Sequence, residues 1–301
     1  MIKPAVLLSS LFYVICLTIS TPGLADPVMQ QATLDGQLRS WRLYMPSSSS
    51  AKPLPLVFNF HGTGSSPENI SALNQLEQLA GQEHFIVVAP QAEFSYEPGG
   101  RKTWNVEQLE SPYDDVAFIR ALIEHLISQY PIDLTRIYAT GFSGGARMSS
   151  LLACELATTF AAIAPIAGVR FADNCKPASA MPVLTYHGKK DPVNHYVHQP
   201  DSPRYWHAGV EDAIHDWVNH NQCHSVSEEN LQAGITKLTW SQCQDDVQVV
   251  FYRSAEGGHT WPDSPKAELL AKYGLGKTDN IAMTQFIWTF FRQYQRQSSA
   301  Q

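Results

Sequence analysis

The chain has 301 residues, of which 44% are hydrophobic and 16% are charged, and its formal net charge is −7. This is the composition of a globular protein, so it excludes wholesale disorder, and the length allows one large domain or two small ones. The negative charge argues against a nucleic-acid or anionic-membrane partner, because both are bound through clustered lysines and arginines.

The first 25 residues have the pattern of an export signal. A lysine near the start is followed by an uncharged, mostly apolar run over residues 5–19, and the small residues Gly23 and Ala25 fit a signal-peptidase site. We expect cleavage after Ala25, because the apolar run of about 15 residues is shorter than the roughly 20 that span a bilayer. An uncleaved membrane anchor is the alternative. The predicted mature chain, residues 26–301, is expected to be secreted or periplasmic, without stable membrane insertion.

Strand and helix patterns alternate along this mature chain. Strands are predicted at residues 39–44, 56–60, 85–89, 137–139, 161–166, 182–186 and 247–252. Helices are predicted at residues 70–79, 115–130, 149–156, 210–218 and 281–294, with Asp114 or Asp115 as the N-cap of the second. Short apolar strands separated by helices predict an α/β fold, with a mainly parallel sheet covered by helices on both faces. The pattern uses nearly the whole chain, so we expect a single domain over residues 26–301.

Four cysteines remain once the export signal is removed. An exported chain meets an oxidising compartment, where disulfides persist, and four cysteines allow three pairings. We expect Cys154–Cys175 and Cys223–Cys243, because each pair closes a loop of only about 20 residues. A zinc site is the alternative, but its cysteines normally stand two to four residues apart.

A glycine-rich turn between a predicted strand and a predicted helix has the sequence Gly141-Phe142-Ser143-Gly144-Gly145. A serine on such a turn is held in a strained backbone conformation with its side chain projecting, as a nucleophile requires. The helix that follows points its first backbone amides at the same place. The alternative is a plain glycine-rich turn with an N-capping serine. We predict that Ser143 is a nucleophile and that the Gly144 N–H is an oxyanion donor.

A serine hydroxyl needs a neighbouring base, and in α/β-hydrolases the acid and then the histidine follow the serine along the chain. Among the histidines after Ser143, His259 stands in a glycine-containing loop after the last predicted strand and is the predicted base. Asp191 follows the predicted strand 182–186 and is the predicted acid, because sites of α/β proteins gather at the carboxyl ends of strands. A turn aspartate before Pro192 is the alternative.

Further residues are expected around this set. The loop His61-Gly62-Thr63-Gly64 follows the strand 56–60, and its Thr63 N–H is the predicted second oxyanion donor. Trp104 and Trp261 either line the substrate site or belong to the core. No metal or cofactor is expected.

Several segments together carry a family resemblance. They are Asp35-Gly36 with Arg39 and Tyr44-Met45-Pro46, the His61–Gly64 loop, Trp104-Asn105, Asp114–Phe118, Arg136–Gly145, His187–Val193 and Gly257–Pro262. In this combination the chain resembles the poly(3-hydroxybutyrate) depolymerase/feruloyl esterase family of secreted α/β-hydrolases, a group like carbohydrate esterase family 1. The resemblance covers about residues 34–295. It implies the α/β-hydrolase fold and ester hydrolysis through an acyl-enzyme, and it supports the two local disulfides.

We therefore expect a secreted serine esterase whose partner is an ester substrate. Polyhydroxyalkanoate polyester or 3-hydroxybutyrate oligomers are the favoured substrates. Feruloyl or acetyl esters of plant polysaccharides are the alternative. A polymer-binding hydrolase-like protein without activity is the non-enzyme alternative.

Overall fold

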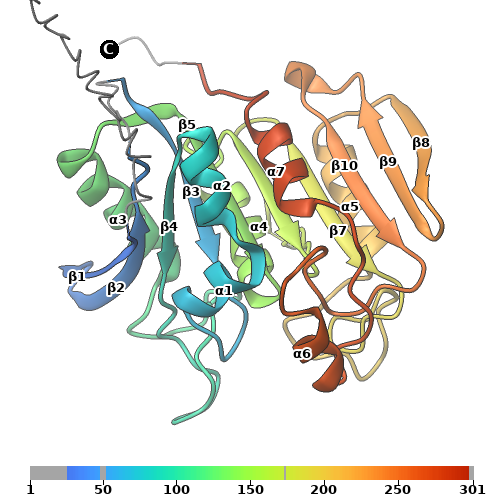
Figure 1. Ribbon diagram of the computed structural model, residues 1–301, viewed down its shortest axis with the longest axis horizontal. Helices are drawn as coiled ribbons and strands as arrows, with labels where there is room; N and C mark the ends of the chain where they lie inside the picture. Colours follow the sequence, from blue (N-terminus) through green and yellow to red (C-terminus); the bar gives the residue numbers. More distant parts are fainter. Residues whose placement is uncertain (1–25, 48–51, 173, 298–301) are drawn as a thin grey trace, which may run out of the picture.

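The computed structural model describes residues 26–47, 52–172 and 174–297, so the predicted export signal lies outside the described residues. A ten-stranded sheet crosses the molecule in the order β1-β2-β4-β3-β5-β6-β7-β10-β9-β8 (Figure 1). Its strands are β1 (Val28–Leu34), β2 (Gln37–Tyr44), β3 (Leu54–Phe60), β4 (Ile86–Pro90), β5 (Ile132–Phe142), β6 (Ala162–Ile166), β7 (Val183–Gly188), β8 (Ser225–Gln232), β9 (Ile235–Ser241) and β10 (Val249–Ser254). The helices are α1 (Pro67–Asn74), α2 (Leu76–Glu83), α3 (Asp115–Gln129), α4 (Gly144–Glu155), α5 (Val210–His220), α6 (Ala267–Lys272) and α7 (Met283–Phe291), with a 3₁₀ turn at Gln244–Asp246.

The centre of the sheet is parallel and its two edges are antiparallel. Strands β4, β3, β5, β6, β7 and β10 pair in parallel, whereas β1 and β2 at one edge and β9 and β8 at the other pair antiparallel. The predicted α/β-hydrolase fold is confirmed. Because the central strands run in one direction, their carboxyl ends meet at one edge of the sheet, and the loops that follow β3, β5, β7 and β10 come together there.

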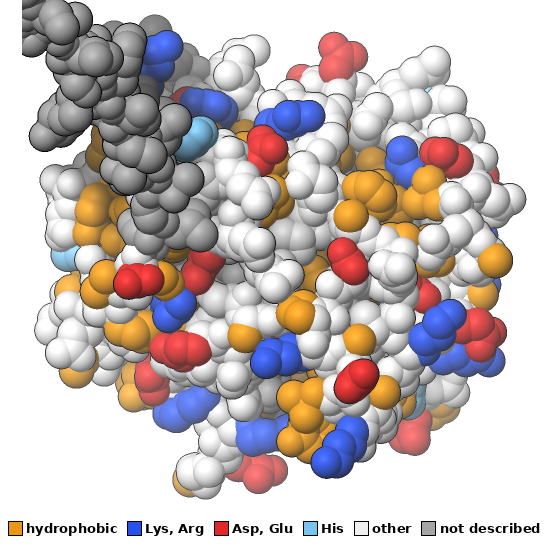
Figure 2. All heavy atoms as spheres, viewed as in Figure 1, with side chains coloured by type: hydrophobic (Ala, Val, Ile, Leu, Met, Phe, Trp, Pro, Cys, Tyr) orange, Lys and Arg blue, Asp and Glu red, His pale blue; other side chains and the backbone are white. Residues whose placement is uncertain are grey.

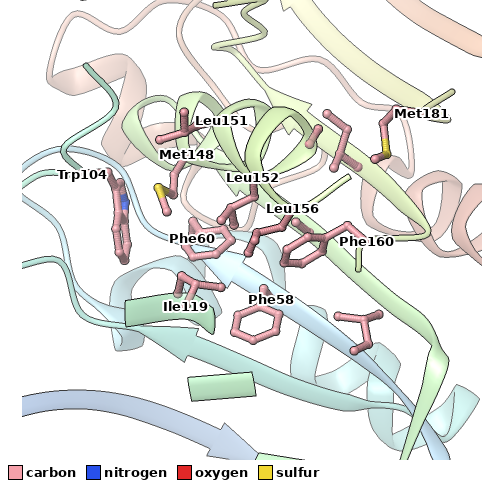
Figure 3. Packing of buried hydrophobic residues seen from close by; sticks show 14 of the residues in the cluster. Phe58, Phe60, Trp104, Ile119, Met148, Leu151, Leu152, Leu156, Phe160 and Met181 are labelled. Atoms are coloured by element: carbon pink, nitrogen blue, oxygen red, sulfur yellow. The ribbon is translucent and has the colours of Figure 1, made fainter. Parts of the chain in front are cut away.

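Alternate residues of each central strand enter two separate cores, one on each face. On β3, Phe58 and Phe60 pack with α3 and α4, whereas Val57 packs on the opposite face with α1, α2 and α7. Figure 3 shows Phe58 and Phe60 against Leu152 of α4 and Leu156, which directly follows that helix. Figure 1 shows α1, α2 and α7 in front of the sheet. Both faces of the central strands are therefore buried, which explains their continuous apolar sequences.

Several predicted elements differ from those observed. The predicted helix 70–79 is two helices, because Gln75 adopts a left-handed conformation with φ of 52° and ends the first one. Strands β1, β8 and β9 and helix α6 were not predicted from the sequence. The residues of β8 are mostly exposed and polar, so this edge strand lacks the apolar pattern that marks the central strands.

Both predicted disulfides are present. Cys154 at the end of α4 pairs with Cys175, and Cys223 after α5 pairs with Cys243 after β9. The Cα atoms are 5.3 Å and 3.8 Å apart, respectively. These pairings use all four cysteines of the predicted mature chain. The zinc alternative for them is therefore wrong.

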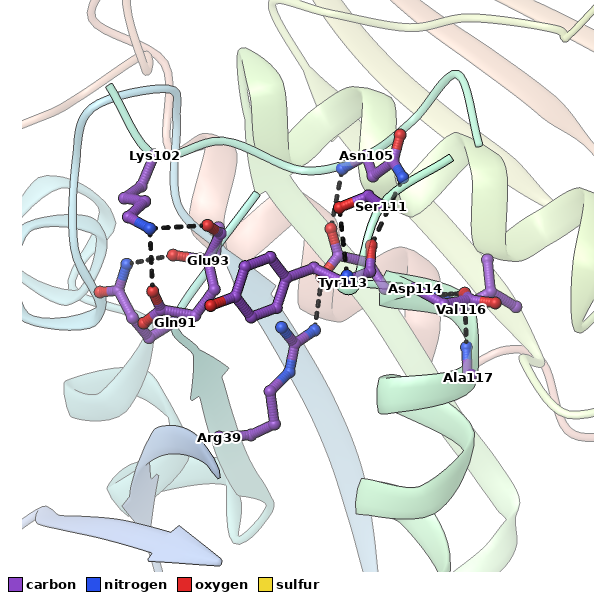
Figure 4. Close-up of polar contacts among 12 residues, drawn as sticks. Arg39, Gln91, Glu93, Lys102, Asn105, Ser111, Tyr113, Asp114, Val116 and Ala117 are labelled. Atoms are coloured by element: carbon purple, nitrogen blue, oxygen red, sulfur yellow. Dashed lines mark hydrogen bonds and ion pairs between the residues drawn. The ribbon is translucent and has the colours of Figure 1, made fainter. Parts of the chain in front are cut away.

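A fully buried ion pair connects β2 to the start of α3. The Nη2 atom of Arg39 lies 2.6 Å from Oδ1 of Asp115, and the backbone N–H of Asn105 donates to Oδ2 of Asp115 at 2.7 Å. The guanidinium also stacks on Phe118, 3.9 Å from the ring centroid. Figure 4 shows Arg39 extending toward Asn105 and the beginning of α3. The pair therefore fixes the segment that precedes Asn105, which reaches the candidate site described below.

Helix α3 begins at Asp114, one of the two predicted N-caps. The Asp114 carboxylate accepts the backbone N–H groups of Val116 at 2.9 Å and Ala117 at 3.0 Å (Figure 4). This leaves Asp115 free to pair with Arg39, so the two adjacent aspartates have different structural roles.

Candidate active site

Ser143 occupies a sharp turn between β5 and α4. Its backbone has φ of 55° and ψ of −114°, a region that residues with side chains rarely adopt. The Ser143 N–H donates to the Ile166 carbonyl at 3.0 Å, and its carbonyl accepts the N–H of Arg147 at 3.1 Å. The neighbouring strand and the helix thus hold the serine in a conformation that it would not adopt alone.

The glycines of this turn are required by close packing. A Cβ atom on Gly141 would lie 2.5 Å from the carbonyl oxygen of Gly145, and one on Gly145 would overlap the backbone carbonyl of Phe60. A Cβ atom on Gly168 would lie 2.5 Å from the carbonyl oxygen of Ser143. The spacing recognised in the sequence therefore has a steric cause, because α4 starts directly against the ends of β3 and β6.

Asp191 and His259 form a short, buried hydrogen bond. His259 Nδ1 lies 2.7 Å from Asp191 Oδ2, and His187 Nε2 lies 3.2 Å from the same oxygen. The other oxygen, Oδ1, accepts the backbone N–H groups of Val193 and Asn194, both at 2.8 Å. Burial acts to raise the pKa of Asp191, but the charge of His259 and the hydrogen bonds from both histidines outweigh it and hold that pKa well below its usual range. Asp191 is therefore an ionised carboxylate that orients His259.

The two loops that carry these residues are bonded to each other. The Lys190 N–H donates to the Gly257 carbonyl at 3.0 Å, and the Lys189 N–H donates to the Ser254 carbonyl at 2.8 Å. Gly188 and Gly257 approach so closely that a Cβ atom on Gly188 would overlap the Gly257 backbone. The glycines therefore allow the loops after β7 and β10 to place Asp191 and His259 side by side.

Thr63, in the loop after β3, lies next to Gly144, the first residue of α4. A Cβ atom on Gly144 would lie 3.1 Å from the backbone nitrogen of Thr63 and 2.7 Å from its Oγ1. The Thr63 hydroxyl bonds to the Thr103 hydroxyl at 2.7 Å, so the segment fixed by the Arg39–Asp115 pair supports this loop. The two predicted oxyanion donors are thus neighbours at the start of α4.

His61 fixes the backbone just before Thr63. Its Nε2 accepts the Ala92 N–H at 3.1 Å, and its Nδ1 lies 2.8 Å from the Gly62 carbonyl, so the ring is neutral with the proton on Nδ1. Burial lowers the pKa of His61 to about 4, against a smaller opposing effect of the bond to Gly62. The neutral His61 ring therefore connects the loop that carries Thr63 to the backbone at Ala92.

A cavity of about 470 Å³ joins these groups. Thr63, Ser143 and His259 all line it, and Asp191 is buried behind His259. Apolar residues of α1 and α6 form part of its wall: Ile70, Leu73, Leu269 and Leu270. Figure 2 shows hydrophobic side chains over α6 at the lower edge of the molecule, with Lys and Arg side chains beside them. The cavity therefore has an apolar side next to a concentrated set of polar groups.

The structure places both tryptophans in the core, which is one of the two alternatives that the sequence left open. Trp104 and Trp261 are completely buried, and neither lines the cavity. The Trp104 indole donates to the His61 carbonyl at 2.9 Å, and the Trp261 indole donates to Thr284 Oγ1 at 3.0 Å. Large aromatic rings with a satisfied N–H are ordinary core residues, so both support the site from behind.

Other residues at the site were not singled out from the sequence. Arg147 and Tyr205 line the cavity, and His187 contacts Asp191. Arg147 stands four residues after Ser143, a helical spacing that places it on the same face. His187 is one of several histidines in that part of the sequence, and only its place at the end of β7 distinguishes it.

None of the helices in residues 26–47, 52–172 and 174–297 is long and apolar enough to cross a membrane. The same residues contain no group of three or more His, Cys, Asp or Glu side chains arranged to bind a metal ion.

The fold is that of an α/β-hydrolase. The family model for "Esterase PHB depolymerase" matches residues 39–216, which include Ser143 and Asp191. The chain therefore belongs to this family of carboxylic ester hydrolases.

Curated relatives include fungal esterases. The chain is 29% identical to feruloyl esterase B of Piromyces equi over 223 residues, covering 70% of this chain and 40% of that protein. It is 25% identical over 233 residues to the bifunctional acetylxylan esterase/xylanase XynS20E of Neocallimastix patriciarum, covering 75% of this chain and 31% of that protein. It is 28% identical over 247 residues to the probable feruloyl esterase C of Aspergillus niger, covering 79% of this chain and 80% of that protein. The chain thus spans less than half the length of the first two relatives.

Solved structures share the fold at low sequence identity. A thermostable esterase superposes with a TM-score of 0.60 at 18% identity, covering 91% of this chain and 64% of that chain. The acetyl xylan esterase from Aspergillus awamori superposes with a TM-score of 0.57 at 18% identity, covering 83% of this chain and all of that one.

Proposed function

We propose that this protein is an exported serine esterase that hydrolyses carboxylic esters through an acyl-enzyme on Ser143. The observation that carries the proposal is the 2.7 Å bond between Asp191 and His259 at the cavity that Ser143 lines. The Ser, Asp, His order along the chain is that of α/β-hydrolases.

The first half of the proposed reaction acylates Ser143. Since the Nδ1–H of His259 donates to Asp191, its Nε2 is the nitrogen that accepts a proton from the Ser143 hydroxyl. Oγ attacks the ester carbonyl as this proton leaves. Asp191 stabilises the imidazolium that forms, and the N–H groups of Thr63 and Gly144 bind the oxyanion. The alcohol leaves with the proton held by His259, and the acyl group stays on Ser143, which completes the first half.

The second half releases the acid. A water molecule gives a proton to His259 and attacks the acyl carbon, and the bond to Ser143 Oγ then breaks as His259 returns that proton to Oγ. The scheme uses only side chains and backbone groups of this chain.

For the substrate, we propose esters of 3-hydroxybutyrate, as polyester or as oligomers, in keeping with the family to which the chain belongs. The second candidate is a feruloyl or acetyl ester of a polysaccharide, because relatives at 25–29% identity are named feruloyl and acetylxylan esterases. The apolar cavity wall from α1 and α6 suits the methyl groups of the first and the aromatic ring of the second.

For the location, we propose that the protein works outside the cytoplasm, in the periplasm or the medium. The two disulfides support this, because such bonds persist in oxidising compartments. Fractionation of an expressing cell tests it, and a product found only in the cytoplasm with its cysteines reduced would contradict it.

Two measurements test the proposed activity. A fluorophosphonate probe should label the wild-type protein and should not label Ser143→Ala. If the protein only binds polymer and has no activity, the probe should label neither of them. A panel of 3-hydroxybutyrate oligomers, polyester film, methyl ferulate and acetylated xylan, compared by kcat/KM, then separates the two substrate classes. Turnover retained in a well-folded Ser143→Ala variant would refute the role of this serine.

A further inference from the structure

Arg147 lies one helical turn beyond Ser143 and lines the same cavity. Its N–H donates to the Ser143 carbonyl at 3.1 Å, which places the two residues four apart on one face of the helix. Only 3% of Arg147 is exposed. Burial lowers its pKa to about 10, so the guanidinium keeps its charge at neutral pH.

The partners of this guanidinium are neutral. Nη1 donates to the Asn194 side-chain oxygen at 3.2 Å, and Cζ stands 4.1 Å from the centre of the Tyr205 ring. The buried Nε has no hydrogen-bond partner among the described residues. No carboxylate forms an ion pair with Arg147 in that part of the chain.

Glu107 is the acid whose charge acts on Arg147, and it is already paired. Its carboxylate lies 2.8 Å from both Arg204 and His207, and 3.8 Å from Arg170. Glu107 is therefore the counter-ion of Arg204 and Arg170, and it forms no ion pair with Arg147.

The cavity as a whole is positively charged. Arg101, Arg147 and Lys266 line it, and the described lining residues include no Asp or Glu. This contrasts with the net charge of −7 on the chain. Arg101 and Lys266 are exposed, so Arg147 is the buried member of the three.

A buried charge without a counter-ion is costly, and proteins ordinarily pair such a group. The fork of N–H donors on a guanidinium matches the two oxygens of a carboxylate. We propose that Arg147 is a carboxylate-binding subsite, so that this enzyme prefers esters that carry a free carboxylate close to the bond that is cleaved. The inference rests on the proposed esterase activity at Ser143.

Two kinds of ester present such a carboxylate. A short hydroxy-acid oligomer carries it on the alcohol side of its last ester bond, and a monoester of a dicarboxylic acid carries it on the acyl side. The dimer of 3-hydroxybutyrate and its terminal amide test the alcohol side. Monoethyl glutarate and ethyl glutaramate test the acyl side.

The wild-type enzyme gives the first result. We expect kcat/KM for the carboxylate to exceed that for the neutral amide by about 10- to 100-fold in one of the two pairs, as a charge-assisted hydrogen bond provides. The pair that shows the preference identifies the side on which the carboxylate binds. Equal values in both pairs would overturn the proposal. Turnover of the neutral esters would still uphold the esterase activity. No turnover of these esters together with no labelling of the wild type by the fluorophosphonate probe would refute both.

The variant Arg147→Gln gives the second result, because glutamine keeps a donor for Asn194 and removes the charge. We expect the ratio of kcat/KM for the carboxylate to that for the neutral amide to fall to about 1. A purely structural role would lower both members of a pair equally and leave the ratio unchanged, which would contradict the subsite. Should this variant not fold, competitive inhibition of the wild type by glutarate but not by glutaramide decides the question.

The matched control is Lys272→Gln. Lys272 is an exposed residue of α6 that does not line the cavity. Its removal changes the net charge by the same amount, so the preference should survive. Repeating both measurements at about 0.5 M salt separates direct binding from long-range attraction, because salt screens exposed charges far more than buried ones.

Discussion

The Nε2 atom of His187 lies 3.2 Å from Oδ2 of Asp191, the oxygen that also binds the His259 imidazole. The same Nε2 lies 2.8 Å from the Asn194 carbonyl, so its proton is shared between a carbonyl and the carboxylate. His187 is completely buried. It is therefore a positioning residue, which holds the carboxylate that in turn orients His259.

We expect His187→Phe to lower kcat by about 2- to 10-fold, because one ordinary hydrogen bond contributes about 0.5–1.5 kcal/mol. His187→Gln offers a side-chain N–H at a similar place and should recover most of this loss. Initial rates with a soluble nitrophenyl ester, together with the melting temperature of each variant, measure the effect. Equal losses in both variants would show that the residue only fills space.

Asp191→Asn removes the charge but keeps the shape of the side chain. The asparagine can donate to His259 Nδ1 and so favour the tautomer with the proton on Nε2, which cannot accept the proton of Ser143. We expect kcat to fall by about 10³- to 10⁴-fold, with KM changed much less. Steady-state kinetics measure both constants, and a loss below about 10-fold would show that Asp191 is not the acid of the site.

Acid should destabilise the protein through His61 before it affects Asp191. The pKa of His61 is about 4 in the folded state and about 6.5 in an unfolded chain. Between these values the unfolded chain binds more protons, so the free energy of unfolding falls as the pH is lowered from about 6.5 to 4, by about 3 kcal/mol. The lowered pKa of Asp191 reduces the free energy of unfolding only at more acid pH, below the value of about 3.9 that an aspartate has in an unfolded chain.

Urea unfolding at a series of pH values measures this dependence. His61→Gln cannot gain a proton, so its free energy of unfolding should change less than that of the wild type between pH 6.5 and 4. The lower overall stability expected of this variant does not affect the comparison, because the slope with pH is the observable. An unchanged slope would mean that other groups cause the acid sensitivity.

The central strands and the turn that carries Ser143 could be predicted from the sequence because a physical pattern marks each of them. Strand β3 is buried on both faces and is continuously apolar, and the G-x-S-x-G turn needs its glycines to avoid the backbone of β3. Strand β8 and helix α6 carry no such pattern, because one is a polar edge strand and the other a short helix with one buried residue.

The site was less predictable where a role depends on what packs nearby. Trp261 stands two residues after His259, and Trp104 follows Thr103, which bonds to Thr63. Their rings nevertheless turn inward to bond with Thr284 and His61. The sequence does not distinguish Arg147 from the other arginines. Only the fold shows that it is buried, that it lines the cavity, and that no Asp or Glu is among the described lining residues. Neighbours in the sequence share a loop, but only the fold decides which side chain faces the cavity.

The last prediction concerns the ion pair between Arg39 and Asp115, whose side chains are 1% and 0% exposed. Arg39→Met should lower the free energy of unfolding by about 3–5 kcal/mol, because it leaves the Asp115 carboxylate buried without a counter-ion. Arg42→Met is the matched control on the same strand. Its ion pair with Glu77 is partly exposed, so its loss should cost about 1 kcal/mol or less.

The double variant Arg39→Met/Asp115→Leu separates the unpaired charge from the loss of packing. Replacing both partners by apolar side chains removes the buried charge, so it should recover much of the stability lost in Arg39→Met. Urea unfolding of the wild type, Arg39→Met, Asp115→Leu and the double variant gives the coupling energy between the two side chains. A double variant less stable than Arg39→Met would show instead that the bond from the Asn105 N–H to Asp115 stabilises the fold by more than the unpaired charge costs.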